Sequence, residues 1–456
     1  MTHGVASVPL TVLVLVGVGA PAMLLGLVGG ASLLDRPLPE RWTGRLAAIA
    51  MTVAFAAFLV AFLTYGMIFR GKQLLAYGAW STTHPGGIAI EFLVDRLSLA
   101  FAALSTAIAG VVSAFSNRYL HREAGYNRYF ILLAIFVTGM LLVALAGNVA
   151  VLFVGWELVG LSSALLVAFF QERPTAVANA FRVASVYRIS DAAMLSAAVL
   201  LHHLAGTSSL SLLFSGQATS TAGLTAANAT IIAVLLIVAV AGKSALLPFS
   251  GWLPRAMEGP TPSSAVYYGS LSIHAGCFLL LRAAPLLERA PAARILAGVL
   301  GAATALFAAL TTRAQSDVKS SLAYASLTQV GLIVVETALG WYALAFVHLA
   351  GHACFRLLQF LSAPNVLHDL HGLEEARDRH AVLPKGRRAG FARSERVRRW
   401  LFLIALERGF LDAILDRAVI EPFNRAARLL TRLDAWLCGA VLPGRAPADE
   451  KEQRHG

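Results

Sequence analysis

Charged residues are scarce in this chain. Only 14% of its 456 residues are Asp, Glu, Lys or Arg, whereas 57% are hydrophobic. A soluble globular protein carries roughly 25% charged and 45–50% apolar residues, so this composition argues against a soluble enzyme. At roughly 20 apolar residues for each helical span, the length suits about a dozen membrane spans.

Cysteine is also scarce, and the motifs of redox enzymes are missing. The three cysteines, Cys277, Cys354 and Cys438, have no paired spacing, so they predict neither a disulfide framework nor a zinc motif. The chain has no glycine-rich dinucleotide loop between a strand and a helix, and no cysteine cluster for an iron–sulfur centre. We therefore expect no metal and no cofactor, and a subunit that is not itself an enzyme.

Acidic residues are outnumbered. Asp and Glu total 25 against 37 Lys and Arg, which gives a formal net charge of +12. In a soluble protein such a surplus would suggest a nucleic-acid partner. In a membrane protein it more often reflects basic cytoplasmic loops, so we expect no nucleic-acid binding.

Long apolar runs, by contrast, are abundant in the sequence. They predict an all-α polytopic membrane protein, because lipid offers no partner for backbone amides outside a helix. The first run, Val8–Leu34, lacks a basic segment before it and is too long for the core of a signal peptide, so we expect a span there. The predicted spans are eleven: 9–30, 46–66, 98–115, 130–147, 150–170, 181–203, 229–247, 262–282, 292–312, 322–339 and 341–363.

The loops predict an orientation in the inner (plasma) membrane. Odd-numbered loops carry most basic residues, and loops 4, 6 and 10 carry none. Loops 2 and 8 are exceptions, with Arg70, Lys72, Arg289 and Arg294. Since basic loops stay in the cytoplasm, the N-terminus is expected outside and the C-terminus in the cytoplasm. We divide the chain into N-terminal spans (1–96), a translocating helical domain (97–371) and a basic tail (372–456).

The tail differs in composition from the spans. Residues 374–399 are polar and strongly basic, and residues 400–442 have apolar side chains at helical spacing. This pattern predicts one or two amphipathic helices lying on the membrane or against a partner. A solvated basic tail attracted to anionic lipid is the alternative.

Several ionisable residues lie inside the predicted spans. Each costs about 2.5–3.5 kcal/mol to insert and marks an ion path by default. Each could instead be structural, as an ion pair or as a histidine bonded to a carbonyl group. Their number favours a proton relay across the membrane, formed by Glu157, Arg188, Asp191, Lys243, His274, His348, His352 and Arg356.

The chemistry of such a relay follows from these residue types. Moving the Glu157 carboxylate or its proton relative to Lys243 would switch the lysine between holding and releasing a proton. Histidines titrate near neutral pH and pass protons between water chains. Directly after Lys243, Pro248, Pro254, Pro260 and Pro262 predict a broken helix in span 7, which is tolerated at membrane depth where it lines an ion path.

These residues lie in segments that resemble a known family. GWELVGLSS, GKSALLPFSGWLPRAMEGPTPSSA, QSDVKSSLAYASLTQVG and HLAGHACFRLLQFLSA resemble the proton-translocating, antiporter-like subunits of respiratory complex I, subunit L above all, and of Mrp antiporters. The similarity runs from about Asp95 to His371. It implies packed helices with a broken span 7, and it matches Glu157, Lys243, Asp191, His348 and His352 to the residues of the family's proton path.

Some positions depart from the complex I pattern. Ser250, Arg255 and Tyr268 stand where the family has His, Asp and His, and Arg356 stands where it usually has Lys. The apolar spans stop after 341–363, so we do not expect the second broken helix or the long lateral helix of subunit L. This shortened form, with YYGSLSIHAG and ALERGFLDAILDRAVIEPF, resembles the DabB-type membrane subunit of the DAB inorganic-carbon pump.

That resemblance implies a function and a partner. The expected partner is a large cytoplasmic, DabA-like subunit similar to zinc carbonic anhydrases. In such a pump, flow of H⁺ or Na⁺ through the membrane subunit drives conversion of CO₂ to bicarbonate in the partner. The alternative is a proton-pumping subunit of an NADH:quinone oxidoreductase, a membrane hydrogenase or an Mrp Na⁺/H⁺ antiporter. A structural protein without transport remains a third possibility.

Overall fold

The computed structural model describes residues 8–69, 72–79, 89–205, 209–210, 225–315, 317–363, 395–406, 409, 413 and 416–441. The chain forms two compact units, Met1–Leu411 and Asp412–Gly456. The division that we expected at residue 96 stays a prediction, and the boundary at 371 lies outside the described residues. Within the first unit, α1 and α2 pack against each other and against α3 and α4.

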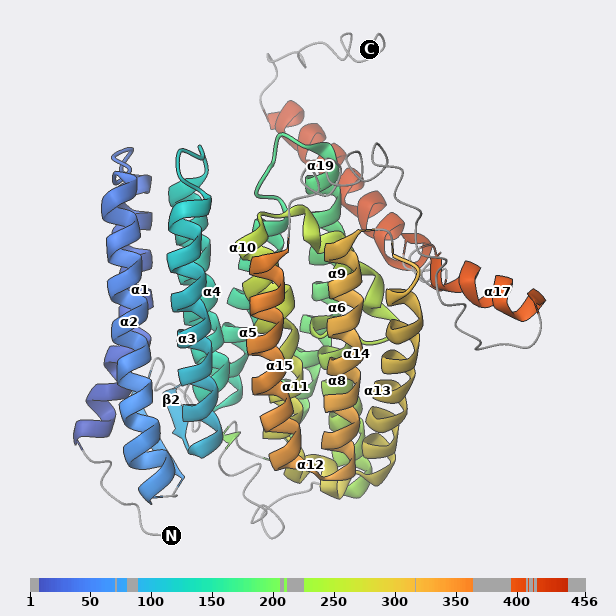
Figure 1. The fold of residues 1–456 in the computed structure, drawn as a ribbon, viewed down its shortest axis with the longest axis horizontal. Coiled ribbons are helices and arrows are strands. Elements are labelled where there is room, and N and C mark those ends of the chain that lie inside the picture. The colour runs from blue at the N-terminus through green and yellow to red at the C-terminus, as the bar shows by residue number, and fades with distance from the viewer. Residues whose placement is uncertain are drawn as a thin grey trace, which may run out of the picture. The chain divides into compact units, whose positions relative to one another are not determined.

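Within the described residues, eleven helices are long and apolar enough to cross a membrane, and each coincides with a predicted span. Figure 1 shows them running side by side in one bundle. The prediction of a polytopic helical membrane protein is therefore confirmed. The helices in this bundle are α1 (Val8–Leu33), α2 (Glu40–Ala61), α3 (Arg96–Tyr119), α4 (Tyr126–Leu145), α5 (Val149–Val167), α6 (Pro174–Ala205), α8 (Ala226–Lys243), α11 (Ser272–Arg282), α13 (Pro291–Thr312), α14 (Val318–Leu339) and α15 (Tyr342–Ser362).

A small hairpin between the second and third spans was not predicted. Helix α2 continues as a π-helix, Phe62–Phe69, before the antiparallel strands β1 (Gln73–Ala79) and β2 (Ala89–Val94). Strand β2 leads into α3, which begins with a capping box: Asp95 accepts from the Ser98 amide and the Ser98 hydroxyl accepts from the Asp95 amide. This box satisfies amides that the first turn of the helix leaves free.

The helix in span 7 ends at Lys243, earlier than the predicted limit of 247. Short pieces follow: the 3₁₀ turns Phe249–Gly251 and Ala256–Glu258, and between them α9 (Trp252–Arg255). Pro248 precedes the first turn and Pro254 lies in α9. Because proline lacks an amide donor, continuous helix is disfavoured here. The predicted break therefore begins at the residue that carries the buried charge.

The span after the break is also irregular. Pro260 and Pro262 flank the start of α10 (Thr261–Ser263), and a π-helix, Ser264–Ser270, leads into α11. Every residue of the 18-residue window in this span is buried, so the segment lies in the centre of the bundle. Helix α12 (Ala284–Arg289) follows α11 and connects it to α13.

Close helix packing depends on small residues. A Cβ atom placed on Gly301 of α13 would lie 2.7 Å from the Gly331 carbonyl oxygen of α14, and one on Gly331 would lie 2.6 Å from the Gly301 oxygen. These two helices therefore meet backbone to backbone, as small residues allow in membrane proteins.

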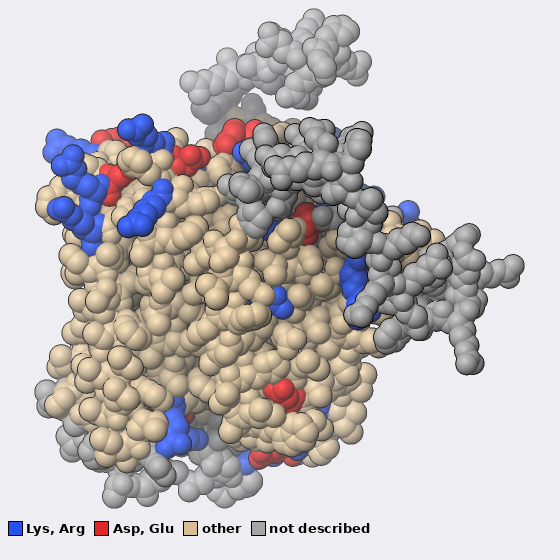
Figure 2. All heavy atoms as spheres, viewed as in Figure 1, with Lys and Arg blue, Asp and Glu red and all other residues tan. Residues whose placement is uncertain are grey.

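Charged side chains gather at the ends of the bundle. Figure 2 shows a broad band with few charges between charged groups at the two ends of the visible face. We name the end that carries the α1–α2, α3–α4, α5–α6 and α13–α14 connections the basic end. The hairpin and α12 lie at the opposite end (Figure 1).

Part of the predicted tail is described. Helix α17 (Glu395–Leu406) belongs to the first unit, and the second unit contains a π-helical turn, Asp416–Ile420, followed by α19 (Glu421–Val441). Apolar side chains of α19 are exposed at helical spacing, at Phe423, Leu429, Leu430, Leu433, Trp436 and Leu437. The helical part of the tail prediction is thus confirmed, and the basic stretch 372–394 lies outside the described residues.

Candidate functional site

Lys243 is the most deeply buried cation of the bundle's described part, with no exposed surface. Its ammonium nitrogen donates to the Trp156 carbonyl oxygen at 3.1 Å. It also lies 4.9 Å from the Trp156 ring centroid and 4.3 Å from that of Tyr187. Aromatic faces stabilise a cation that has lost its water. The last residue of α8 is therefore held by α5 and α6.

Carboxylates and a second cation adjoin this lysine. Asp191 lies 3.7 Å from the Lys243 nitrogen and 2.8 Å from an Arg188 nitrogen. Arg188 also donates to Glu157 at 2.8 Å. The direct partner of Glu157 is therefore Arg188, and the carboxylate nearest to Lys243 is Asp191. Sequence reasoning grouped these four residues and coupled Lys243 to Glu157, and the structure shows Asp191 as the carboxylate nearest to the lysine.

The four charges differ in exposure. The Lys243 and Asp191 side chains are 0% and 5% exposed, whereas those of Glu157 and Arg188 are 27% and 50% exposed. The pair Glu157–Arg188 thus lies at the surface of the bundle, and Asp191 connects it to the buried lysine. A change at the outer pair can alter the charge balance around Lys243.

A second chain of polar groups crosses from α11 to α15. His274 bonds through Nδ1 to the Ser270 carbonyl oxygen at 2.5 Å, and its Nε2 lies 2.9 Å from His352 Nδ1. Arg356 donates to His352 Nε2 at 3.1 Å and to Gln359 Oε1 at 2.6 Å. Spacing of four residues on α15 had predicted one stripe, and His352 and Arg356 are buried together on it.

His348, one turn before His352, lies in a cluster of its own. Its Nδ1 is 2.9 Å from Glu336 Oε1, and its Nε2 is 3.0 Å from Gln329 Oε1, both on α14. The His348 and His352 ring centroids are 6.4 Å apart. Sequence reasoning missed Glu336, although it stands in the apolar run VGLIVVETALG and the rule for intramembrane charge applies to it.

The Lys243 group (Glu157, Arg188, Asp191 and Lys243) and the histidine row, which are the two polar chains of the bundle, approach each other at α8 and α11. The Ser244 hydroxyl, next to Lys243, donates to the Ile273 carbonyl oxygen at 2.6 Å, directly before His274. Tyr187, which covers Lys243, lies beside Ser272. The Ser270 hydroxyl is buried without a hydrogen-bond partner in the described part of the chain. Buried waters bind such polar groups and bridge them.

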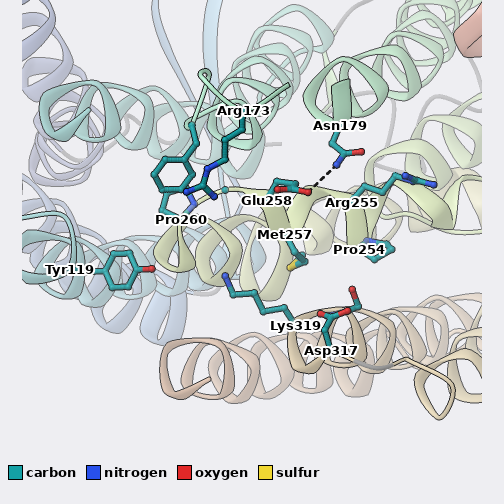
Figure 3. Close-up of a pocket in the computed structure, with 13 residues that line it drawn as sticks. Tyr119, Arg173, Asn179, Pro254, Arg255, Met257, Glu258, Pro260, Asp317 and Lys319 are labelled. Carbon is teal, nitrogen blue, oxygen red and sulfur yellow. Dashed lines mark hydrogen bonds between the residues drawn. The ribbon is translucent and has the colours of Figure 1, made fainter. Parts of the chain in front are cut away.

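A polar cavity opens beside the broken helix at the basic end. Its volume is about 600 Å³, and it is bordered by α3, α6, the pieces after α8 and the start of α14. In Figure 3 the Lys319 side chain extends into it, and Asn179 bonds to Glu258 across one wall. Its lining residues include Tyr119, Arg173, Asn179, Pro254, Arg255, Met257, Glu258, Pro260, Asp317 and Lys319.

The comparisons with known proteins cover most of the bundle. Residues 146–387 match the family model described as NADH:quinone oxidoreductase/Mrp antiporter, TM, and residues 80–130 match the N-terminus of complex I chain 5. The first of these models covers more than half of the chain. This chain belongs to that family. The Lys243 site, the broken helix and the histidine chain all lie inside the matched range.

Among curated relatives, subunit L of the NADH-quinone oxidoreductase of Mycobacterium tuberculosis is 35% identical over 64% of this chain and 46% of its own length. The Campylobacter jejuni subunit L is 37% identical over 62% and 47%. The chain thus spans about half the length of these relatives.

Two solved structures have the same fold. A chain of the Mrp complex from Dietzia sp. aligns with a TM-score of 0.65 at 29% identity, over 77% of this chain and 37% of that one. A chain of an archaeal membrane-bound sulfane sulfur reductase aligns with a TM-score of 0.66 at 18% identity, over 77% and 70%. The second likeness concerns the fold alone.

Proposed function

We propose that this chain is an ion-translocating subunit of a membrane complex, and that protons move along its two buried polar chains. The observation that carries the proposal is the approach of these chains at Ser244 and Ile273. A buried lysine with a carboxylate at 3.7 Å and a histidine pair at 2.9 Å are groups that can hold and pass protons. Isolated ionisable groups in a membrane are costly, so a connected set favours transport.

The ion path starts, in this proposal, at the cavity of the basic end. The cavity is lined by Glu258 and Lys319 and by Pro254 and Pro260, two of the four prolines that follow Lys243. Because the break ends α8 at Lys243, the segment that lines this cavity, Pro254–Pro260, begins within about a dozen residues of the lysine in the chain. The proposed orientation puts the basic end in the cytoplasm, which agrees with the concentration of Lys and Arg in cytoplasmic loops.

The finer proposal is that ion flow drives inorganic-carbon uptake. Support comes from the resemblance of YYGSLSIHAG and of the tail to the DAB pump, together with the exposed apolar face of α19. The partner would be a large cytoplasmic zinc protein similar to carbonic anhydrases, which would carry out the hydration of CO₂. The chain described here would conduct H⁺ or Na⁺ and perform no catalysis itself.

Uptake of labelled bicarbonate and CO₂ by cells expressing the full complex tests this proposal. Uptake should fall to background with an uncoupler and with Lys243→Ala, because both remove the ion flow that drives the reaction. Lys72→Ala, which removes an exposed lysine before β1, is the matched control and should leave uptake unchanged. Uptake that persists both with the uncoupler and in Lys243→Ala would contradict the proposal.

A second function is favoured by the relatives themselves. Subunit L of NADH-quinone oxidoreductases and the Mrp complex chain share this fold and 29–37% of aligned residues. In that case the chain pumps or exchanges ions in a respiratory or antiporter complex. Identification of the proteins that purify with the chain decides between the two: quinone-reductase, hydrogenase or antiporter subunits favour this one, and a single large zinc protein favours carbon uptake.

A further inference from the structure

Glu336, Gln329 and His348 form a cluster that the two polar chains leave out. Glu336 lies in the last turn of α14, and the Gly340 turn (φ 87°) and Trp341 follow it. Glu336 is therefore about one helical turn, or about 5 Å, from the end of α14 opposite to the basic end, and Gln329 lies about 10 Å deeper along the helix. Gln329, Glu336 and His348 are all partly buried.

The hydrogen bonds of His274 and His352, which are more buried than His348, assign both imidazoles as neutral. His274 Nδ1 faces a carbonyl oxygen and must donate, so its Nε2 accepts from His352 Nδ1. His352 Nε2 then accepts from Arg356, which has donors only. Every contact of this row is satisfied with one proton on each ring.

His348 has a different environment. Glu336 Oε1 faces Nδ1 and Gln329 Oε1 faces Nε2, so both ring nitrogens face acceptors. An imidazole that donates from both nitrogens carries two protons and a positive charge. The second carboxylate oxygen, Glu336 Oε2, is buried and has no hydrogen-bond partner among the described residues. The cluster is therefore arranged to hold one mobile proton, on His348 or on Glu336.

We propose that Glu336, Gln329 and His348 form a proton-binding site at which the relay releases protons at the end of the bundle opposite to the basic end. His348 lies one turn from His352 on the same face of α15, and the centroids of the two rings are 6.4 Å apart in an edge-to-face contact. This inference rests on the proposed function and adds a terminus to its path.

The step is a simple proton transfer. The N–H bond at His348 Nδ1 breaks and an O–H bond forms on Glu336, which leaves a neutral imidazole and a neutral carboxylic acid. Glu336 then gives the proton to water at the end of α14, and a proton from the His352 side reloads the imidazole. No oxidant, reductant or other reactant takes part.

Other ionisable groups near this site come from two further elements. Cys277 of α11 lies close enough to Glu336 for an electrostatic interaction with its carboxylate. Arg294 of α13 donates a hydrogen bond to the Ala338 carbonyl oxygen at the end of α14. Cys277 is fully buried. Arg294 is a second positive charge that can stabilise the Glu336 carboxylate at this end. The experiment therefore has to distinguish a proton-binding Glu336 from one that only holds α14 and α15 together.

Glu336→Gln makes that separation. The glutamine carbonyl oxygen still accepts from His348, so contact between α14 and α15 is kept, but the amide cannot take the proton. Proton flux of the purified complex in proteoliposomes, followed with a pH-sensitive dye, should fall about a hundredfold or more, because positioned acid–base groups contribute roughly 10²–10⁴-fold. Glu336→Asp should restore part of the flux.

Glu288→Gln is the matched control, because Glu288 also bonds to α15, through Tyr342 at 2.8 Å, but lies off the stripe. The Glu288→Gln complex should keep the proton flux of the wild type. Full flux in Glu336→Gln, while Lys243→Ala has none, would overturn this inference and leave the proposed function intact. Full flux in Lys243→Ala as well would overturn the proposed function itself.

Discussion

At the scale of single residues, the placement of Lys243 depends on the absence of a side chain opposite to it. A Cβ atom on Gly160 of α5 would lie 2.8 Å from the Lys243 nitrogen. The atom that has to give way is the far end of a flexible side chain, so the bundle can accept the methyl group. The ammonium, however, cannot stay at its present distances from the Trp156 oxygen and Asp191.

Gly160→Ala should therefore lower proton flux several-fold while the protein still folds. The reason is geometric: hydrogen-bond and charge interactions weaken when the lysine nitrogen moves away from its partners. Gly110→Ala is the control, because its new Cβ would meet only Met51 Cβ, at 3.8 Å. Flux in proteoliposomes and size-exclusion profiles measure the two effects. Equal flux in both variants would show that the position of Lys243 is not critical.

At the scale of elements, one ion pair connects the hairpin, α3 and α11. Arg282, at the end of α11, donates to both oxygens of Asp95, the residue between β2 and α3, at 2.5 and 3.2 Å. Burial raises the pKa of the Asp95 carboxyl, but the Arg282 charge and the hydrogen bonds from Arg282 and Ser98 together hold it below its usual value. The pair thus fixes the Arg282 end of the central span that contains His274.

Arg282→Met should lower the melting temperature of the purified protein strongly, because removing one partner of a buried pair costs about 3–5 kcal/mol. Asp95→Asn added to it should recover part of the loss, since no uncompensated charge remains. Arg41→Met, at an exposed arginine of α2, is the control. A melting temperature unchanged in Arg282→Met would mean that the pair contributes nothing to stability.

The same pair gives a pH dependence with a definite sign. Because the folded-state pKa of Asp95 is lowered, its contribution is fully present above the ordinary carboxyl pKa of about 3.9 and is lost as pH falls through the lowered value. Melting curves of the wild type and Asp95→Asn should therefore converge below that range and separate above it. Parallel curves at every pH would contradict this assignment.

At the scale of the whole molecule, the sequence predicted the spans well and the contacts within the site less well. Apolar runs of about 20 residues fix where helices form in lipid, and all eleven runs coincide with helices. The hairpin at residues 73–94 was not predicted, because runs of about 20 apolar residues do not detect strands of seven and six residues. Spacing of four residues placed His352 and Arg356 on one face, since that rule depends on local geometry.

Partners across different helices could not be derived from spacing. Nothing in the sequence says that Glu157 bonds to Arg188 while Asp191 is the carboxylate nearest to Lys243, because this depends on how α5, α6 and α8 are rotated in the bundle. Glu336 could have been singled out as a charge inside an apolar run. Its contact with His348, which connects it to the stripe, could not be derived, because it depends on how α14 and α15 are packed.

The central claim is that the lysine chain and the histidine chain are one path. Proton flux of the purified complex in sodium-free proteoliposomes tests it most directly, for Lys243→Ala, His352→Ala and the double variant. One path predicts that each single variant loses the flux and that the double variant is no worse. Flux that survives in either single variant, or losses that multiply in the double variant, would show that the two chains conduct separately.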